Sequence, residues 1–213
     1  MTRIRNLLRA GAVVGIAIVL SGCITVFPKT KPAQLYRFDG AEEASVAPGP
    51  TATDRVGIVR VRGGFNGAAS TDRIMTVTGS EIAYVAEARW AAPAVTLFDE
   101  ALTRAFTRQT GPVRLVARGE PGRAPYSLRL DVERFEAVYD RGGKAAPDVR
   151  VEIHAVLVRA ADRAVIKDEM IATHARAGDN RVSAIVQAFE LSTKQALDEV
   201  VKLTVEGARP IAG

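Results

Sequence analysis

Three long runs of alternating apolar and polar residues constrain the fold of this chain most strongly. The first, YSLRLDVERFEAVY, begins at Tyr126, and VRVEIHAVLV and AVIKDEMIATHAR follow from Val149 and Ala164. Strict alternation is typical of a strand that buries one face. Only the polar connections RGGKAAPD and RAADR separate the runs. The sequence therefore predicts three successive strands that form an antiparallel meander.

The first of these runs changes phase once. Its apolar residues occupy even positions as far as Val132 and odd positions from Phe135 onward. One extra residue near Glu133–Arg134 would return both sets to the same face, which is the effect of a β-bulge. We therefore predict a bulge at this point, with Val132 and Phe135 facing the same core.

Two stretches show the spacing of three and four residues that indicates an amphipathic helix. The first covers Val95 to Gln109, between Pro93 and the breaker pair Gly111-Pro112. The second begins near Asp179–Asn180, either of which could supply a helix cap. Its expected apolar stripe consists of Val182, Ile185, Val186, Phe189, Ala196, Leu197 and Val200.

The first half of the chain contains shorter β-rich segments. QLYRFD from Gln34 is an expected first strand, and RIMTVTGSEIAYVAE is an expected hairpin that turns at Gly79-Ser80. The small, polar segment Gly40 to Thr53 is an expected loop. Together these patterns predict an α+β fold: a two-layer sandwich with a mainly antiparallel sheet, a three-strand meander and two amphipathic helices on one face.

The single cysteine of the chain, Cys23, lies in an unusual context. Three arginines precede an uncharged run from Ala10 to Leu20, which has the pattern of a secretory signal peptide. This run is shorter than the about 20 apolar residues of a membrane span. Leu20-Ser21-Gly22-Cys23 matches the bacterial lipobox, so we expect cleavage before Cys23 and a diacylglyceryl group on its thiol, with palmitate-type acyl chains. The alternative is a structural cysteine in a signal sequence that is cut elsewhere.

The residue after Cys23 bears on the target membrane. Ile24 stands where an aspartate favours inner-membrane retention in enterobacterial lipoproteins. We therefore expect the periplasmic face of the outer membrane, with the inner membrane as the alternative. The segment that follows contains Pro28 and Pro32 and is typical of an extended tether.

The net charge does not indicate a nucleic-acid partner. The whole chain has 29 Lys+Arg and 24 Asp+Glu, a formal net charge of +5. Three arginines and no acid precede Cys23, so the rest of the chain holds 26 basic and 24 acidic residues, a net charge of +2. With no second cysteine, no disulfide can form within the chain, and the core must be stable through packing.

Patterns that would indicate catalysis are absent from the sequence. It contains neither GxxxxGK[ST] nor GxSxG, and its two histidines, His154 and His174, lack the spacing of metal ligands. We expect His154 to face solvent or a polar neighbour, and Asp168 and Glu169 to point to opposite faces of their strand. No catalytic residue, cofactor site or metal site is predicted, and the chain is not expected to be an enzyme.

The sole tryptophan lies in a connecting segment, AEARWAAPAV, and allows two interpretations. Trp90 either fills the core between the hairpin and the first helix or, together with Arg89, contacts a partner protein. Tryptophans are mostly buried, which favours the core. Trp and Arg are also enriched at interaction hot spots, which makes Arg89 and Trp90 candidate contact residues.

Five segments occur in a fixed order along the chain: the lipobox, LYRFD, DRIMTVTGSEIAYVAEARWAAP, YSLRLDVERFEA and VSAIVQAFELSTKQALDEV. In this combination the chain resembles the ABC-type transport auxiliary lipoprotein family, which includes the lipoprotein of paraquat-inducible intermembrane transport. The resemblance divides the chain into a signal peptide (1–22), a lipidated tether (23–34), one auxiliary domain (35–206) and a frayed tail (207–213).

The resemblance implies a non-enzymatic component of an MCE-type lipid transport system at the outer membrane. Its expected partners are an inner-membrane ABC permease and ATPase, an MCE-domain protein, the membrane itself and phospholipid, and a homo-oligomer is compatible with the sequence. The alternative is a structural or regulatory lipoprotein that assembles or activates another envelope complex. In the first case we expect any lipid route to lie between proteins, because one small two-layer domain leaves little internal space.

Overall fold

A computed structural model describes residues 32–38, 55–117, 120 and 124–208. The compact unit Ala33–Gly213 contains eight strands and two helices among these residues. Their bounds are β1 Gln34–Tyr36, β2 Val56–Phe65, β3 Arg73–Thr78, β4 Glu81–Trp90, α2 Ala94–Arg108, β5 Val113–Leu115, β6 Tyr126–Val138, β7 Asp148–Arg159, β8 Val165–Arg176 and α3 Val182–Gly207.

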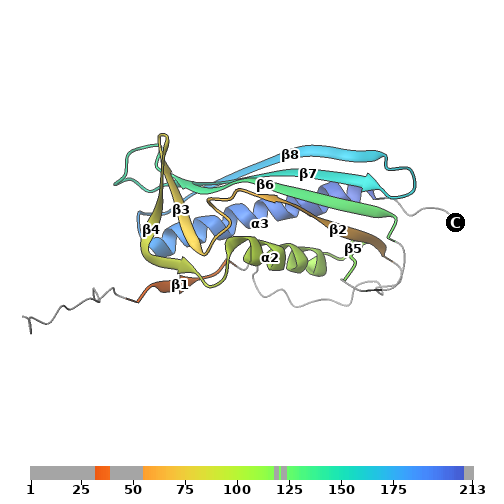
Figure 1. Ribbon diagram of the computed structural model, residues 1–213, viewed down its shortest axis with the longest axis horizontal. Coiled ribbons are helices and arrows are strands. Elements are labelled where there is room, and N and C mark those ends of the chain that lie inside the picture. Colours follow the sequence, from red (N-terminus) through yellow and green to blue (C-terminus); the bar gives the residue numbers. More distant parts are fainter. Residues whose placement is uncertain (1–31, 39–54, 118–119, 121–123, 209–213) are drawn as a thin grey trace, which may run out of the picture. The chain divides into compact units, whose positions relative to one another are not determined.

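The strands form one mixed sheet, and α2 and α3 lie on the same side of β6, β7 and β8 (Figure 1). β6 is antiparallel to β7, and β7 is antiparallel to β8. The structure does not confirm a mainly antiparallel sheet: four of the seven pairings between described strands are parallel, although the longest pairings are antiparallel. The sheet is mixed because one edge of β6 takes two parallel neighbours in succession, β2 and then β3.

The predicted bulge in β6 is confirmed. The register with β7 shifts between Val132 and Arg134, so Glu133 has no direct partner. Val132 and Phe135 are 3% and 1% exposed, and both belong to the core. The bulge therefore keeps the apolar residues of the whole strand facing the helices.

Both helices follow the predicted periodicity. α2 begins after Pro93, whose carbonyl accepts hydrogen bonds from the backbone N–H groups of Thr96 and Leu97. The expected cap of α3 was wrong. Neither Asp179 nor Asn180 caps it, because the helix begins later, with Arg181 at the cap position and no side-chain cap.

Core side chains converge between the sheet and α3. The inner positions of β7 are fully buried: Val149, Val151, Ile153, Ala155 and Leu157. This agrees with the alternation in the sequence. Thr173 of β8 connects the two layers, because its hydroxyl lies 2.9 Å from both the carbonyl and the hydroxyl oxygen of Ser192 in α3.

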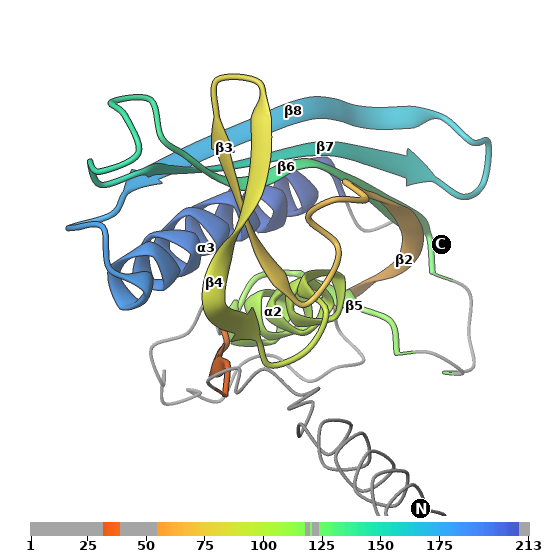
Figure 2. The same cartoon turned by 60° about the vertical axis from the view of Figure 1, so that its left-hand side comes forward.

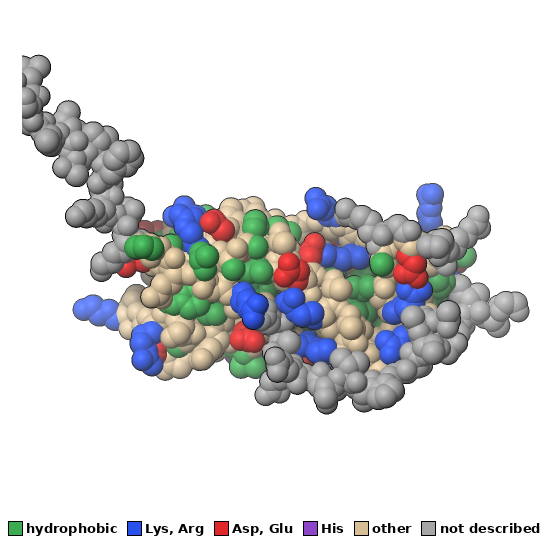
Figure 3. All heavy atoms as spheres, turned by 90° about the horizontal axis from the view of Figure 1, so that it is seen from below, with side chains coloured by type: hydrophobic (Ala, Val, Ile, Leu, Met, Phe, Trp, Pro, Cys, Tyr) green, Lys and Arg blue, Asp and Glu red, His purple; other side chains and the backbone are tan. Residues whose placement is uncertain are grey.

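The tip of the β3–β4 hairpin projects beyond β6, β7 and β8 (Figure 2). Its two-residue turn at Gly79-Ser80 is the predicted one, and β3 and β4 pair antiparallel. On the helix side of the domain, apolar, basic and acidic side chains are interspersed (Figure 3). The described residues that are visible on that face therefore form no large patch of a single chemical kind.

Candidate functional site

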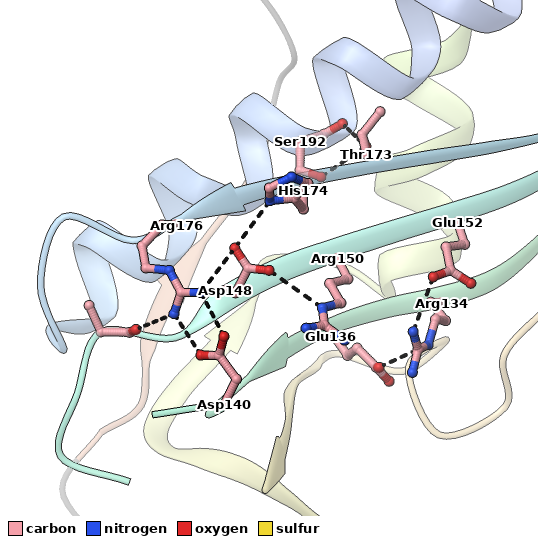
Figure 4. Close-up of polar contacts among 11 residues, drawn as sticks. Arg134, Glu136, Asp140, Asp148, Arg150, Glu152, Thr173, His174, Arg176 and Ser192 are labelled. Atoms are coloured by element: carbon pink, nitrogen blue, oxygen red, sulfur yellow. Dashed lines mark hydrogen bonds and ion pairs between the residues drawn. The ribbon is translucent and has the colours of Figure 1, made fainter. Parts of the chain in front are cut away.

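A cluster of charged side chains occupies the outer face of β6, β7 and β8, on the side of the sheet away from α3 (Figure 4). The bulge at Glu133 creates it, because the shift in phase turns Arg134 and Glu136 outward. Register then places Glu136 beside Arg150 and Arg134 beside Glu152. Residues of opposite charge thus alternate across neighbouring strands, an arrangement that stabilises the pairing.

Arg134 joins two carboxylates at one end of the cluster. Its Nη1 donates to Glu152 Oε1 at 3.1 Å, and its Nε lies 3.2 Å from Glu136 Oε1. The hydrogen bond to Glu152 is the main reason that the pKa of Arg134 is raised. The Glu136 side chain is only 7% exposed, so Arg134 compensates for the loss of water around that carboxylate.

Asp148 lies among two arginines and one histidine at the other end. Its carboxylate is 3.4 Å from Arg150 Nε, 3.4 Å from His174 Nδ1 and 3.7 Å from Arg176 Nη2, and the side chain is 8% exposed. A buried polar group needs hydrogen-bond partners. With these neighbours around it, Asp148 forms part of a network that joins β7 to β8.

Arg176 forms the strongest pair of the cluster with Asp140. Its two Nη atoms donate to the two Asp140 oxygens at 2.7 Å each, and Nη1 also donates to the Ala146 carbonyl at 3.1 Å. Such bidentate pairs are stronger than single hydrogen bonds. The hydrogen bond from Arg176 is the main reason that the pKa of Asp140 is lowered to about 2. The same contact raises the pKa of Arg176.

These side chains surround an open hollow of about 370 Å³, lined by Arg134, Asp148, Arg150, Glu152, Ala172, Thr173 and His174. Its chemistry is that of a recognition surface. The acids are engaged by arginines, and the guanidinium groups are held in place by the acids. Such a surface suits a polar or charged protein partner. It does not suit acyl chains, which need an apolar site.

The remaining predicted polar residues behave as the alternation indicated. His154 Nε2 lies 2.6 Å from Asp168 Oδ1, so His154 has the expected polar neighbour. Glu169 is on the other face of β8, where Lys167 Nζ donates to it at 3.3 Å. Among the described residues, no group of His, Cys, Asp and Glu has the arrangement of a metal site.

The two candidate contact residues lie in different environments. Trp90 is 2% exposed, and its ring packs against those of Phe38, Phe135 and Phe189 at centroid distances of 5.1, 6.3 and 5.3 Å. Of the two interpretations, this burial supports the core. Arg89 is half exposed, and its Nη1 donates to Asp72 Oδ2 at 2.9 Å. Contact between Arg89 and a partner remains a prediction.

The lipobox and Cys23 lie outside the described residues, as do the predicted signal peptide and most of the tether. In the part of the chain that is described, no helix has the length and hydropathy of a membrane span. The charged hollow was not predicted from the sequence. The phase shift did place Arg134 and Glu136 on the outer face, but their partners depend on the register between strands.

Comparison with known proteins gives one family and several similar structures. The family model of the ABC-type transport auxiliary lipoprotein component matches residues 36–201. The crystal structure of XCC0632 from Xanthomonas campestris, a DUF330 protein, is similar with a TM-score of 0.64 and 21% identity, over 82% of this chain and 96% of that one. No curated protein matches.

Two further solved structures share the fold. An uncharacterized protein has a TM-score of 0.61 at 11% identity, over 81% of this chain and 98% of that one. The hypothetical protein CT253 from Chlamydia trachomatis has a TM-score of 0.52 at 8% identity, over 72% and 97% of the two chains. At these identities the likeness concerns the fold alone, whereas the family match spans most of the chain. The chain belongs to the family of ABC-type transport auxiliary lipoprotein components.

Proposed function

We propose that this chain is anchored through Cys23 to the periplasmic face of the outer membrane. There it serves an ABC/MCE-type intermembrane lipid transport system as a non-enzymatic component. The observation that carries the proposal is the order of two features along one chain: a lipobox that ends at Cys23, and a family match that begins at residue 36. A membrane attachment point is thus followed by a short tether and then by the auxiliary domain.

The anchor accounts for a durable position at the membrane. Each buried CH₂ group contributes roughly 0.8 kcal/mol, and a single acyl chain gives only reversible binding. Two or three chains on Cys23 make attachment stable. Ile24, which is not an aspartate, supports export to the outer membrane.

The surfaces of the domain support a role in assembly. The charged hollow on β6–β8 offers fixed, alternating charges, which suit docking to another protein. In this proposal the ABC permease, the ATPase and the MCE-domain protein lie in the inner membrane, and the lipid route runs between copies or partners. Arg89, exposed beside Asp72, is a second place for a partner contact.

Cys23→Ser tests the anchor. The expected result is loss of acylation and an uncleaved precursor, whereas the unchanged chain has a mature N-terminus at Cys23 with a diacylglyceryl group and lies in outer-membrane fractions. Ser21→Ala keeps a small lipobox residue and should be processed normally. The measurement is intact-mass spectrometry of detergent-extracted protein. A mature N-terminus elsewhere, without lipid, would refute the proposal.

A further inference from the structure

The β3–β4 hairpin has a tight and well-defined tip. Thr78 and Glu81 form the closing pair around Gly79-Ser80, and Gly79 has a φ of 60°. Gly79 at the first turn position has a positive φ and Ser80 at the second does not, which is the signature of a type II′ turn, a turn favoured in two-residue hairpins. The hairpin therefore projects as a two-stranded arm whose register is fixed by its turn (Figure 2).

One edge of this arm is open. Because the closing pair exchanges both of its backbone hydrogen bonds, the N–H and C=O groups of Ile82 and Tyr84 point away from β3. The opposite residue confirms this phase: the carbonyl of Val77, across from Ile82, accepts from the Tyr139 N–H at 2.8 Å on the β6 side. Of the described strands, only β1 lies along this edge of β4, and it pairs with Ala88–Trp90 alone.

A bulge separates the open arm from the part of β4 that pairs with β1. Ile74 of β3 lies opposite four residues of β4, Val85–Ala88. Within that bulge Glu87 has a φ of 54°, a left-handed conformation that non-glycine residues seldom adopt. Bulges bend a strand and increase its twist. From Glu81 to Glu87 the outer edge of β4, away from β3, has no strand partner among the described residues.

The open edge is apolar. Its sequence between Glu81 and Glu87 is IAYVA, and the Ile82 side chain is 54% exposed. Edge strands are usually protected by lysine, proline or a covering element, because unpaired backbone groups invite another strand. IAYVA contains neither lysine nor proline.

We propose that a second copy of this chain pairs with this edge, antiparallel, with the two-fold axis at Ala83. In this register Ile82 lies opposite Tyr84 of the second copy, so the outward backbone groups form four hydrogen bonds. Ile82 and Tyr84 also form an aliphatic–aromatic cross-strand pair, a favourable combination. The close, non-hydrogen-bonded position on the axis is occupied by Ala83, whose side chain is small enough to meet its own copy.

Charge favours this register over the neighbouring one. A two-fold axis at Tyr84 would place Glu81 opposite Glu87 of the second copy, and like charges directly opposite are destabilising. With the axis at Ala83, Glu81 lies opposite Val85 instead. The contact is small, so the dimer is expected to be weak and concentration-dependent. This inference goes beyond the proposed transport function and does not depend on it.

Cysteine cross-linking tests the pairing. In the full-length chain with Cys23→Ser, purified in detergent, Ala83→Cys is the only thiol. Cα atoms of a non-hydrogen-bonded pair lie about 4.5 Å apart, within the disulfide range of roughly 4.4 to 6.8 Å. The control is Leu191→Cys, at a residue of α3 that is 50% exposed. Under mild oxidation we expect Ala83→Cys to form disulfide dimers at least about tenfold faster than this control.

A second substitution distinguishes specific pairing from collision. Ile82→Lys, added to Ala83→Cys, should lower the rate to that of the Leu191→Cys control, because a lysine protects an edge strand. Circular dichroism should show that all variants are folded. A rate for Ala83→Cys equal to that of Leu191→Cys, or a rate that Ile82→Lys leaves unchanged, would overturn the proposal. If this edge instead pairs with a strand of another protein, the purified chain should give the first of these results, equal rates for Ala83→Cys and Leu191→Cys.

Discussion

Arg89 and Trp90 are adjacent in the sequence but have opposite environments. Trp90 lies in an aromatic cluster with Phe38, Phe135 and Phe189, whereas Arg89 lies at the surface beside Asp72. Adjacent residues of a strand point to opposite faces, which explains the difference. The sequence favoured burial of Trp90, but it placed both residues in a connecting segment and not at the end of β4, so it could not show that they point to opposite faces.

This difference can be measured as stability. Trp90→Ala should lower the free energy of unfolding by about 3–5 kcal/mol, the usual cost of removing a large aromatic side chain from a core. Arg89→Ala should change it by about 1 kcal/mol or less, because exposed ion pairs contribute little. Urea denaturation followed by fluorescence or circular dichroism measures both. Equal effects of the two substitutions would contradict the assignment of Trp90 to the core.

Asp140 provides a prediction for acid pH. Its pKa in the folded protein is about 2, below the ordinary value of 3.8, mainly because Arg176 donates hydrogen bonds to it. Its ionised form therefore stabilises the fold above about pH 4, and this contribution is lost as the pH falls from 3.8 to about 2. Asp140→Asn should reduce the free energy of unfolding at pH 5 more than at pH 2.5.

A double-mutant comparison isolates the pair. With Arg176→Gln as the background, Asp140→Asn should have the same effect at both pH values, because the partner that lowers the pKa is gone. Urea titrations of the four proteins at pH 5 and pH 2.5 provide the comparison. A pH dependence that persists in the Arg176→Gln background would show that another group is responsible.

At the scale of elements, local sequence patterns predicted several features of the fold correctly. The bulge at Glu133, the hairpin at Gly79-Ser80 and the helix after Pro93 were all predicted, because each depends on residues close together in sequence. The parallel neighbours of β6 were not. They depend on how β6, which follows β4, α2 and β5 in the chain, comes to lie beside both β2 and β3. Alternation within a strand carries no information about which strands become neighbours.

Strand β2 requires glycine at one position, where its register with β6 shifts. A Cβ atom at Gly63 would overlap the backbone carbonyl oxygen of Leu130, whereas one at Gly64 would lie 3.3 Å from the Asp131 side chain. Gly63→Ala should therefore lower the free energy of unfolding by about 1–3 kcal/mol, the typical cost of overpacking. Gly64→Ala is the matched control and should cost clearly less. Equal unfolding midpoints in urea would refute this close approach.

At the scale of the whole molecule, the sequence predicted the family but not the charged surface, and attachment at Cys23 remains a prediction. The family resemblance rested on several segments in order, and the family model matches residues 36–201. The charged hollow requires Arg134, Asp148 and His174, which are far apart in sequence and meet only through the register of β6, β7 and β8. Such a site depends on the pairing of strands, which single-sequence patterns do not specify.

The central claim is that this chain acts as a lipid-anchored component of an ABC/MCE transport system. The most direct test is in-cell cross-linking, followed by detergent extraction, affinity capture of the tagged chain and identification of its partners by mass spectrometry. We predict at least about tenfold enrichment of an ABC permease, its ATPase and an MCE-domain protein with the unchanged chain relative to Cys23→Ser. Enrichment of a different envelope complex, without any of these three proteins, would contradict the account.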